Sequence, residues 1–201
     1  MFRTVVAVAV TVVLASLPGR ARAHCDTADG PVGKAVAESL ASKNLDLTRV
    51  WVKPEADAAL AAAFKKAQAV RGLSAEAREL ADESFLATAI RLHRAGEGEP
   101  FTGVKPAGAD PGPAVRAADE AIATGSLAPV EKLLGAEHRA ALAEKFGPLA
   151  GKPTPPKEVA QGRRWVEAYV VFVHAVDGAF RGEAKGCGHG QQPHAEPEHA
   201  H

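Results

Sequence analysis

The residues of this chain best suited to chemistry are a histidine and a cysteine that stand side by side, His24 and Cys25. If the chain is cut just before His24, this residue offers two metal ligands, its new α-amine and a ring nitrogen. Cys25 adds a thiolate and a backbone nitrogen. An α-amine, with a reference pKa of about 7.7–8.0, loses its proton readily beside a cation. Such nitrogen and sulfur donors favour copper or nickel and can also hold zinc, but they do not suit calcium or magnesium.

The first 23 residues have the features of a secretory signal peptide that would produce this cut. Arg3 gives a positive start, residues 5–17 are almost wholly apolar, and Ala21-Arg22-Ala23 is an A-x-A cleavage site. The apolar run is too short to cross a hydrocarbon core of roughly 30 Å. We therefore expect an exported protein, periplasmic or secreted, that starts at His24 and keeps no membrane span after cleavage.

The start of the expected mature chain, HCDTADG at residues 24–30, resembles the nickel hook of nickel superoxide dismutases. Those enzymes are helical bundles whose processed chain begins His-Cys-Asp-x-x-Cys-Gly. The resemblance implies that His24 and Cys25 are metal ligands. Asp29 stands where that family has its second cysteine, and Val32 where it has a tyrosine, so Asp29 is a weaker candidate ligand.

Nearly the whole mature chain is also similar to an uncharacterised family of exported bacterial proteins. Two motifs carry this similarity, HCDTADGPV at residues 24–32 and RLHRAGEG at residues 91–98. The similarity implies a shared fold but no established activity.

Two further histidines, His93 and His174, are candidates to complete a metal site. Helical spacing places His93 on an apolar face, so its ring should point inward. His174 shares its side of a helix with Glu167 and Asp177, and a carboxylate there could hold the second nitrogen of a metal-bound imidazole. Glu167 is accordingly a weaker member of the site. The alternative is that both histidines are ordinary hydrogen-bonded core residues.

The last 20 residues, 182–201, have no apolar stripe and should form a disordered tail. Spaced histidines on such a segment can bind late first-row metals weakly. The same tail carries Cys187, which could instead form a disulfide with Cys25 after export. The four histidines of the tail are His189, His194, His199 and His201.

Alanine-rich segments with Leu or Phe at helical spacing dominate the chain, and this pattern predicts an all-α fold. Ser74 is an N-cap candidate for one of these helices, and Pro54 opens another. Trp165, Tyr169 and Phe172 on the last helix are interpreted as packing residues. The four clearest predicted helices cover residues 54–71, 74–95, 136–149 and 156–181.

A shift of 82 residues aligns the chain with itself, pairing Gly30-Pro31 with Gly112-Pro113 and Phe64 with Phe146. With one deletion the alignment continues to His93 and His174, at a shift of 81. We therefore predict a pseudo-twofold bundle of two three-helix halves, in which these two histidines face each other. The helical domain covers 24–181, with half-repeats at about 28–95 and 110–181 joined by a Gly- and Pro-rich loop at 96–109.

Composition excludes some function classes and leaves others open. The 24 basic residues are balanced by 24 acidic ones, which argues against a nucleic-acid partner. The common hydrolase, zinc protease and nucleotide motifs are absent. The leading hypothesis is an exported protein that binds nickel or copper. One version of this hypothesis is that the protein is a redox enzyme. The alternatives are a non-catalytic metal buffer or chaperone that uses the tail, and a structural helical module. The sequence does not exclude a homo-oligomer.

Overall fold

The computed structural model describes residues 24–182, and this part of the chain is all-α, as predicted. Its one β-type contact is an isolated parallel bridge between Thr27 and Lys105. Within these residues no helix is both long and apolar enough to cross a membrane. The predicted signal peptide and the histidine-rich tail lie outside the described residues.

The helices begin and end where the chain supplies suitable residues. Ser74 caps α5 by accepting a hydrogen bond from the Ala77 amide at 3.1 Å. Glu158 does the same for α9, accepting from the amides of Ala160 and Gln161. The first group of helices comprises α2 (Pro31–Ser42), α3 (Asp46–Arg49), the 3₁₀ turn η1 (Pro54–Ala56), α4 (Asp57–Val70) and α5 (Ala75–Gly96).

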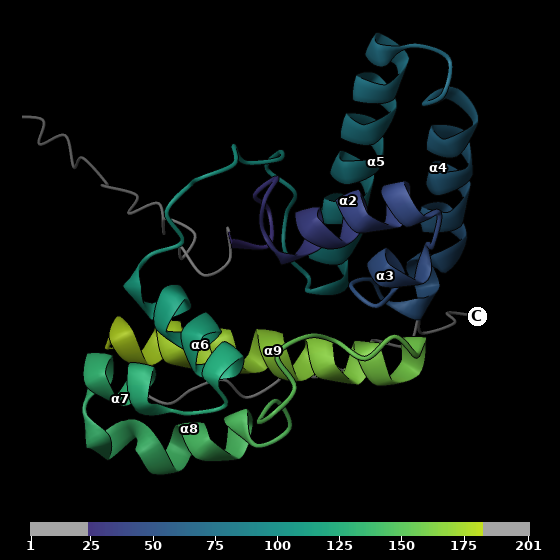
Figure 1. Cartoon of the computed structure of the whole chain (residues 1–201). Helices are drawn as coiled ribbons and strands as arrows, with labels where there is room; N and C mark the ends of the chain where they lie inside the picture. Colours follow the sequence, from purple (N-terminus) through teal and green to yellow (C-terminus); the bar gives the residue numbers. More distant parts are fainter. Residues whose placement is uncertain (1–23, 183–201) are drawn as a thin grey trace, which may run out of the picture.

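The second group follows in the same order after the loop that starts at Glu97. Figure 1 shows the two groups one above the other, with α9 running along their boundary. Pro113 stands at the start of α6, as Pro31 does in α2. The second group comprises α6 (Pro113–Thr124), α7 (Ala128–Leu134), the 3₁₀ turn η2 (Ala136–His138), α8 (Arg139–Phe146) and α9 (Val159–Phe180).

The helix boundaries recur at the spacing of the sequence repeat. The starts of α2 and α6, of η1 and η2, and of α4 and α8 each differ by 82 residues (31 to 113, 54 to 136, 57 to 139). Helices α5 and α9 both have 22 residues, but their starts differ by 84 (75 to 159). By position within the helix, His93 therefore corresponds to Asp177, and the expected match of His93 with His174 does not follow from the helix boundaries.

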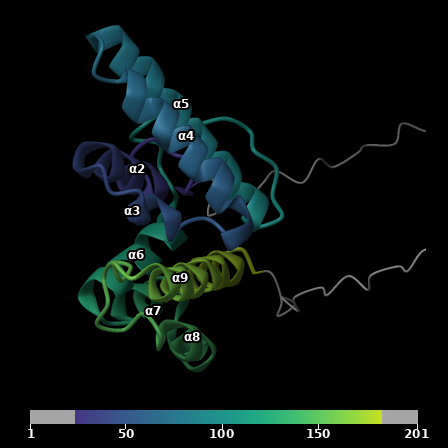
Figure 2. The same ribbon diagram turned by 90° about the vertical axis from the view of Figure 1, so that its right-hand side faces the viewer.

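Helix α9 carries many of the contacts between the two groups, and Figure 2 shows it beneath α2–α5 from a second side. Trp51, which follows α3, packs edge-on against Trp165 and Tyr169 of α9, with ring centroids 6.3 and 5.9 Å apart. Arg163 donates a hydrogen bond from Nε to the Val52 carbonyl at 3.0 Å. The aromatic residues of α9 are thus packing residues that also tie one group to the other.

Candidate functional site

The first described residues, 24–30, fold into a tight turn that we call the N-terminal hook. The Gly30 amide donates to the Thr27 carbonyl at 3.1 Å, and the Thr27 hydroxyl donates to the His24 carbonyl at 3.1 Å. A Cβ atom at Gly30 would clash with the backbone carbonyl oxygen of His24 and would lie 2.6 Å from the Thr27 hydroxyl oxygen. Glycine is therefore required here for the backbone to approach itself closely.

The loop between α5 and α6 holds the hook in place. The Lys105 amide donates to the Asp26 carbonyl at 2.8 Å, and the Ala28 amide donates to the Lys105 carbonyl at 3.0 Å. The Gly108 amide donates to the Asp29 carboxylate at 2.8 Å, and this bond lowers the pKa of Asp29. Asp29 is exposed and anchors the loop. The residue that replaces the second cysteine of the nickel hook therefore makes a structural contact in this chain.

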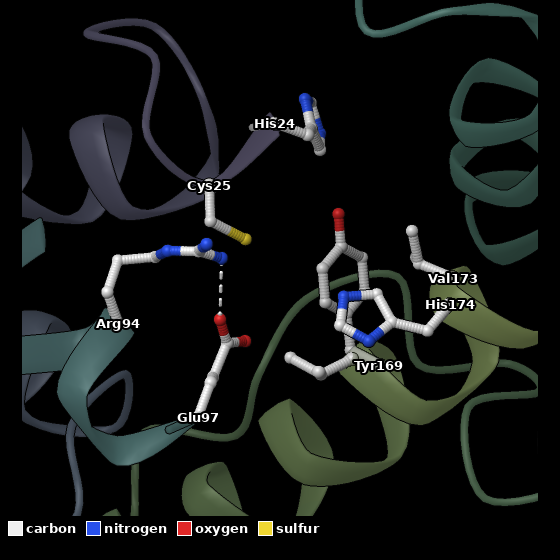
Figure 3. A pocket seen from close by; sticks show the side chains of 8 residues that line it. His24, Cys25, Arg94, Glu97, Tyr169, Val173 and His174 are labelled. Atoms are coloured by element: carbon white, nitrogen blue, oxygen red, sulfur yellow. Dashed lines mark hydrogen bonds and ion pairs between the residues drawn. The ribbon is translucent and has the colours of Figure 1, made fainter. Parts of the chain in front are cut away.

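Next to the hook is a small hollow between the N-terminus, the end of α5 and the face of α9. It is small, with a volume of about 10 Å³ that the centre of a water-sized sphere can occupy. Figure 3 shows the Cys25 sulfur and the Tyr169 hydroxyl pointing into this space, with the His174 ring beside Tyr169. Three of the predicted site residues, His24, Cys25 and His174, therefore line one hollow. Its lining residues are His24, Cys25, Arg94, Glu97, Tyr169, Val170, Val173 and His174.

The Cys25 side chain is buried in an acidic environment. Only 7% of the residue is exposed, and burial raises the pKa of its thiol well above the usual value. The carboxylates of Glu97, Asp26 and Asp119 raise this pKa further, while Arg94 opposes them. A thiolate at this position would thus be stabilised by additional positive charge close to the sulfur.

Asp119 of α6 links two of the lining residues. One carboxylate oxygen, Oδ2, lies 3.0 Å from His24 Nε2, and the other, Oδ1, accepts a hydrogen bond from the Tyr169 hydroxyl at 2.9 Å. Burial is the main cause that raises the pKa of Tyr169 well above its usual value, and the Asp119 charge adds to it. Tyr169 is therefore a neutral hydrogen-bond donor to Asp119.

Arg94 is one of the lining residues of the hollow and is 4% exposed. Its Nη1 lies 3.1 Å from a Glu97 carboxylate oxygen, and its Nε lies 3.6 Å from Asp26 Oδ1. His93 stands behind Glu97, with Nε2 3.4 Å from the other Glu97 oxygen and Nδ1 2.7 Å from the Trp51 carbonyl oxygen. His93 points inward as predicted, but it is not among the lining residues of the hollow.

The remaining candidates lie elsewhere or outside the described residues. Glu167 is exposed and does not line the hollow, and buried Asp177 pairs with Arg181 at 2.8 Å. Within residues 24–182, no three His, Cys, Asp or Glu side chains are grouped closely enough to hold a metal ion. Cys25 is a free cysteine in the described chain, and Cys187 lies outside it, so the disulfide alternative stays open. The tail histidines His189, His194, His199 and His201 lie outside it as well.

Sequence reasoning did not assign three residues of this site, namely Arg94, Glu97 and Asp119. The first two belong to the RLHRAGEG motif, but no spacing rule links them to the hook. Asp119 did carry a signal, because it stands four residues after Val115 and three before Ile122, both buried on α6. A carboxylate on the apolar face of a helix requires a partner, and here its partners are His24 and Tyr169.

Comparison with known proteins adds one match. A family model described as a family of unknown function, DUF6448, matches residues 29–175. The matched range includes Arg94, Asp119, Tyr169 and His174, and it begins after Cys25. No curated protein and no solved structure matches the chain.

Proposed function

Since the chain belongs to the family of unknown function DUF6448, whose description names no activity, we propose a function from the site itself. In this proposal the mature protein binds one late transition metal ion, copper or nickel, at its N-terminus. His24 and Cys25 supply the donors of the hook, and His174 supplies a third side chain from α9.

The observation that carries the proposal is the convergence of His24, Cys25 and His174 on one hollow. These residues stand at opposite ends of the described chain, and each belongs to a donor type that late transition metals prefer. An ordinary core would fill this place with apolar side chains, as Val170 and Val173 do on the same wall. Two imidazoles and a thiol in one small hollow are suited to a metal.

The charges around the hollow support a cation as its occupant. Three carboxylates, those of Glu97, Asp26 and Asp119, raise the pKa of the Cys25 thiol, and the Arg94 guanidinium lowers it. Binding of a divalent metal would favour the thiolate and offset the repulsion from these carboxylates. Such an environment suits neither an anionic ligand nor an apolar one.

His24, Cys25 and His174 line one hollow, but within residues 24–182 these three side chains do not lie close enough together to hold an ion by themselves. The missing donors in this proposal are the α-amine of His24 and the backbone nitrogen of Cys25. The α-amine exists only after cleavage between Ala23 and His24. When bound, copper or nickel would supply one-electron redox chemistry in this hollow, and the protein residues would hold and orient the ion.

The test compares two forms of the exported protein after extensive dialysis. One begins with His24, as verified by intact mass, and the other carries one extra residue before His24. We expect about one copper or nickel ion per chain in the first form and little in the second, because the extra residue converts the α-amine into an amide. Equal metal content in the two forms, or none in either, would reject the N-terminal site. Several ions bound by both forms before dialysis and lost during it would favour the alternative of a metal-buffering tail.

A second comparison tests the contribution of α9. His174→Ala should lower the metal affinity of the mature protein at least about tenfold, because it removes one donor from the hollow. His138→Ala is the matched control, since the His138 ring contacts the Leu134 carbonyl at 3.0 Å, away from the hollow. Competition titration with a chelator measures both affinities, and equal affinities in the two variants would remove His174 from the site.

A further inference from the structure

The contact between Asp119 and His24 restricts how the His24 ring can be used. An Asp119 carboxylate oxygen lies 3.0 Å from His24 Nε2, so a lone pair on that nitrogen would be repelled by the negative charge beside it. A hydrogen on Nε2 turns this repulsion into attraction. In a neutral ring, the proton then resides on Nε2 and the lone pair on Nδ1.

The chelate at the mature N-terminus requires this same tautomer. Nδ1 is separated from the α-nitrogen by three carbon atoms, so the two can close a six-membered ring with one metal ion. Nε2 lies on the far side of the imidazole and cannot reach the same ion. The ring nitrogen that Asp119 leaves unprotonated is therefore the one that the chelate needs.

We propose that Asp119 is the positioning residue of this site, and that it holds His24 in the Nε2–H tautomer and directs Nδ1 toward the hollow. The proposal rests on the proposed function for its metal, but the tautomer itself is a property of the metal-free protein. In this respect Asp119 would act as carboxylates commonly act behind metal-bound imidazoles.

One buried neighbour restrains the Asp119 side chain, which is itself 38% exposed. Its second oxygen accepts the Tyr169 hydroxyl at 2.9 Å, so the carboxylate cannot rotate freely. Tyr169 is itself 5% exposed and is stacked on Trp165, with ring centroids 5.2 Å apart and an angle of 12° between the planes. Trp51 packs against the Tyr169 ring edge-on. The aromatic contacts between the two helix groups thus fix the carboxylate that contacts His24.

The direct test is the tautomer of His24 in the metal-free mature protein, measured by NMR with ¹⁵N-labelled histidine at a pH of about 8.5, where an ordinary imidazole is neutral. The wild type should show His24 mainly as the Nε2–H form. Asp119→Asn should shift His24 toward a mixture, whereas the control Glu120→Gln, on the exposed face of the same helix, should not. The same tautomer ratio in the wild type and in Asp119→Asn would overturn the proposal.

The metal affinity gives a second readout, by chelator competition with copper as the probe. Asp119→Asn should weaken binding about 10–100-fold, the usual cost of losing such a partner. Tyr169→Phe keeps the carboxylate and removes only its hydroxyl partner, so it should weaken binding by a smaller factor. It serves as the informative variant if Asp119→Asn does not fold. A loss for Tyr169→Phe as large as that for Asp119→Asn would contradict the assignment of the central role to Asp119.

The two proposals fail in different ways. A wild-type protein that shows the Nε2–H form but retains no metal would refute the proposed function and support the role of Asp119. A protein that binds one metal ion with unchanged affinity in Asp119→Asn would refute the role of Asp119 and support the proposed function.

Discussion

At the scale of single residues, Arg94 is the cation shared by three carboxylates beside the hollow. It is buried, and carboxylates of Asp26, Glu97 and Glu99 lie 3.1–3.7 Å from its nitrogens. Buried carboxylates are costly without a cation, whereas a complete network roughly offsets its own desolvation. Burial already raises the pKa of Asp26, and Arg94 is the first of the groups that lower it.

Removal of this guanidinium should therefore destabilise the fold strongly. We expect Arg94→Leu to lower the free energy of unfolding by about 3–5 kcal/mol, because it leaves buried carboxylates without their partner. Arg91→Leu, at an exposed position on the same helix, should change it by no more than about 0.5 kcal/mol. Urea denaturation of the metal-free protein measures both, and similar values for the two variants would show that the network contributes little.

The residues of the site differ in how far the sequence could reveal them. His24 and Cys25 are identified by chemistry and by their place after a cleavage motif, which are local properties. His174 and inward-pointing His93 follow from helical spacing, but spacing cannot tell that one lines the hollow while the other binds the Trp51 carbonyl. Whether Asp119 belongs to the site depends on which helix faces the hook, and tertiary packing decides this.

At the scale of elements, the start of α9 is packed unusually closely against the first helix group. A Cβ atom placed on Gly162 would lie 2.8 Å from the Pro156 carbonyl oxygen and 2.9 Å from Val50 Cβ. One of these atoms belongs to the backbone, so the contact cannot be relieved by a side-chain rotation. Gly162 allows α9 to approach Val50, and thereby places Tyr169 and His174, further along the helix, beside the hook.

Gly162→Ala provides a test of this close approach. Alanine is favoured over glycine inside a helix by about 1 kcal/mol, but the steric conflict should outweigh this gain and lower stability by about 1–2 kcal/mol net. Gly72→Ala is the matched control, because nothing lies within 4 Å of a Cβ atom at Gly72. This control should be neutral or stabilising by up to about 1 kcal/mol. Thermal unfolding measures both changes, and a stabilised Gly162→Ala would contradict the tight packing of α9.

Helices with strong periodicity and clear ends were predictable, and four of them appear close to their predicted ranges as η1 with α4, α5, η2 with α8, and α9. Helices α3 and α7, of 4 and 7 residues, are too short for a periodic signal and were not predicted individually. The bonds between the loop and the hook could not be predicted, since they join backbone atoms about 80 positions apart without any side-chain pattern.

At the scale of the whole molecule, the hollow lies where the two helix groups meet. The first group and the hook provide His24, Cys25, Arg94 and Glu97 to its lining, and the second group provides Tyr169 and His174, with Asp119 hydrogen-bonded to Tyr169. Helical spacing and the internal repeat predicted a helical bundle, but the faces that meet are selected by packing over the full chain. The recurring helix boundaries are consistent with a duplication of one half. The duplication itself stays a prediction.

Removal of the tail distinguishes metal bound in the hollow from metal bound by the histidines of the tail. A mature chain that ends at Gly182 should keep about one tightly held metal ion and unfold within about 2 °C of the full chain, because the described core ends before that residue. Elemental analysis and thermal unfolding of the two forms measure this. Loss of all metal on truncation would assign metal binding to residues 183–201 instead of the hollow.

The hollow brings together the two ends of the folded chain, since His24 and His174 are 150 positions apart. A chain that has not been synthesised past residue 174 lacks one wall of the hollow, so in the proposed function it could not hold an ion between both walls. An ion held by both walls would also close almost the entire fold into one ring, a constraint that for a disulfide around 100 residues corresponds to about 4.7 kcal/mol of unfolded-state entropy. Metal binding would thus require a chain that extends past residue 174, and it would stabilise the folded protein against unfolding.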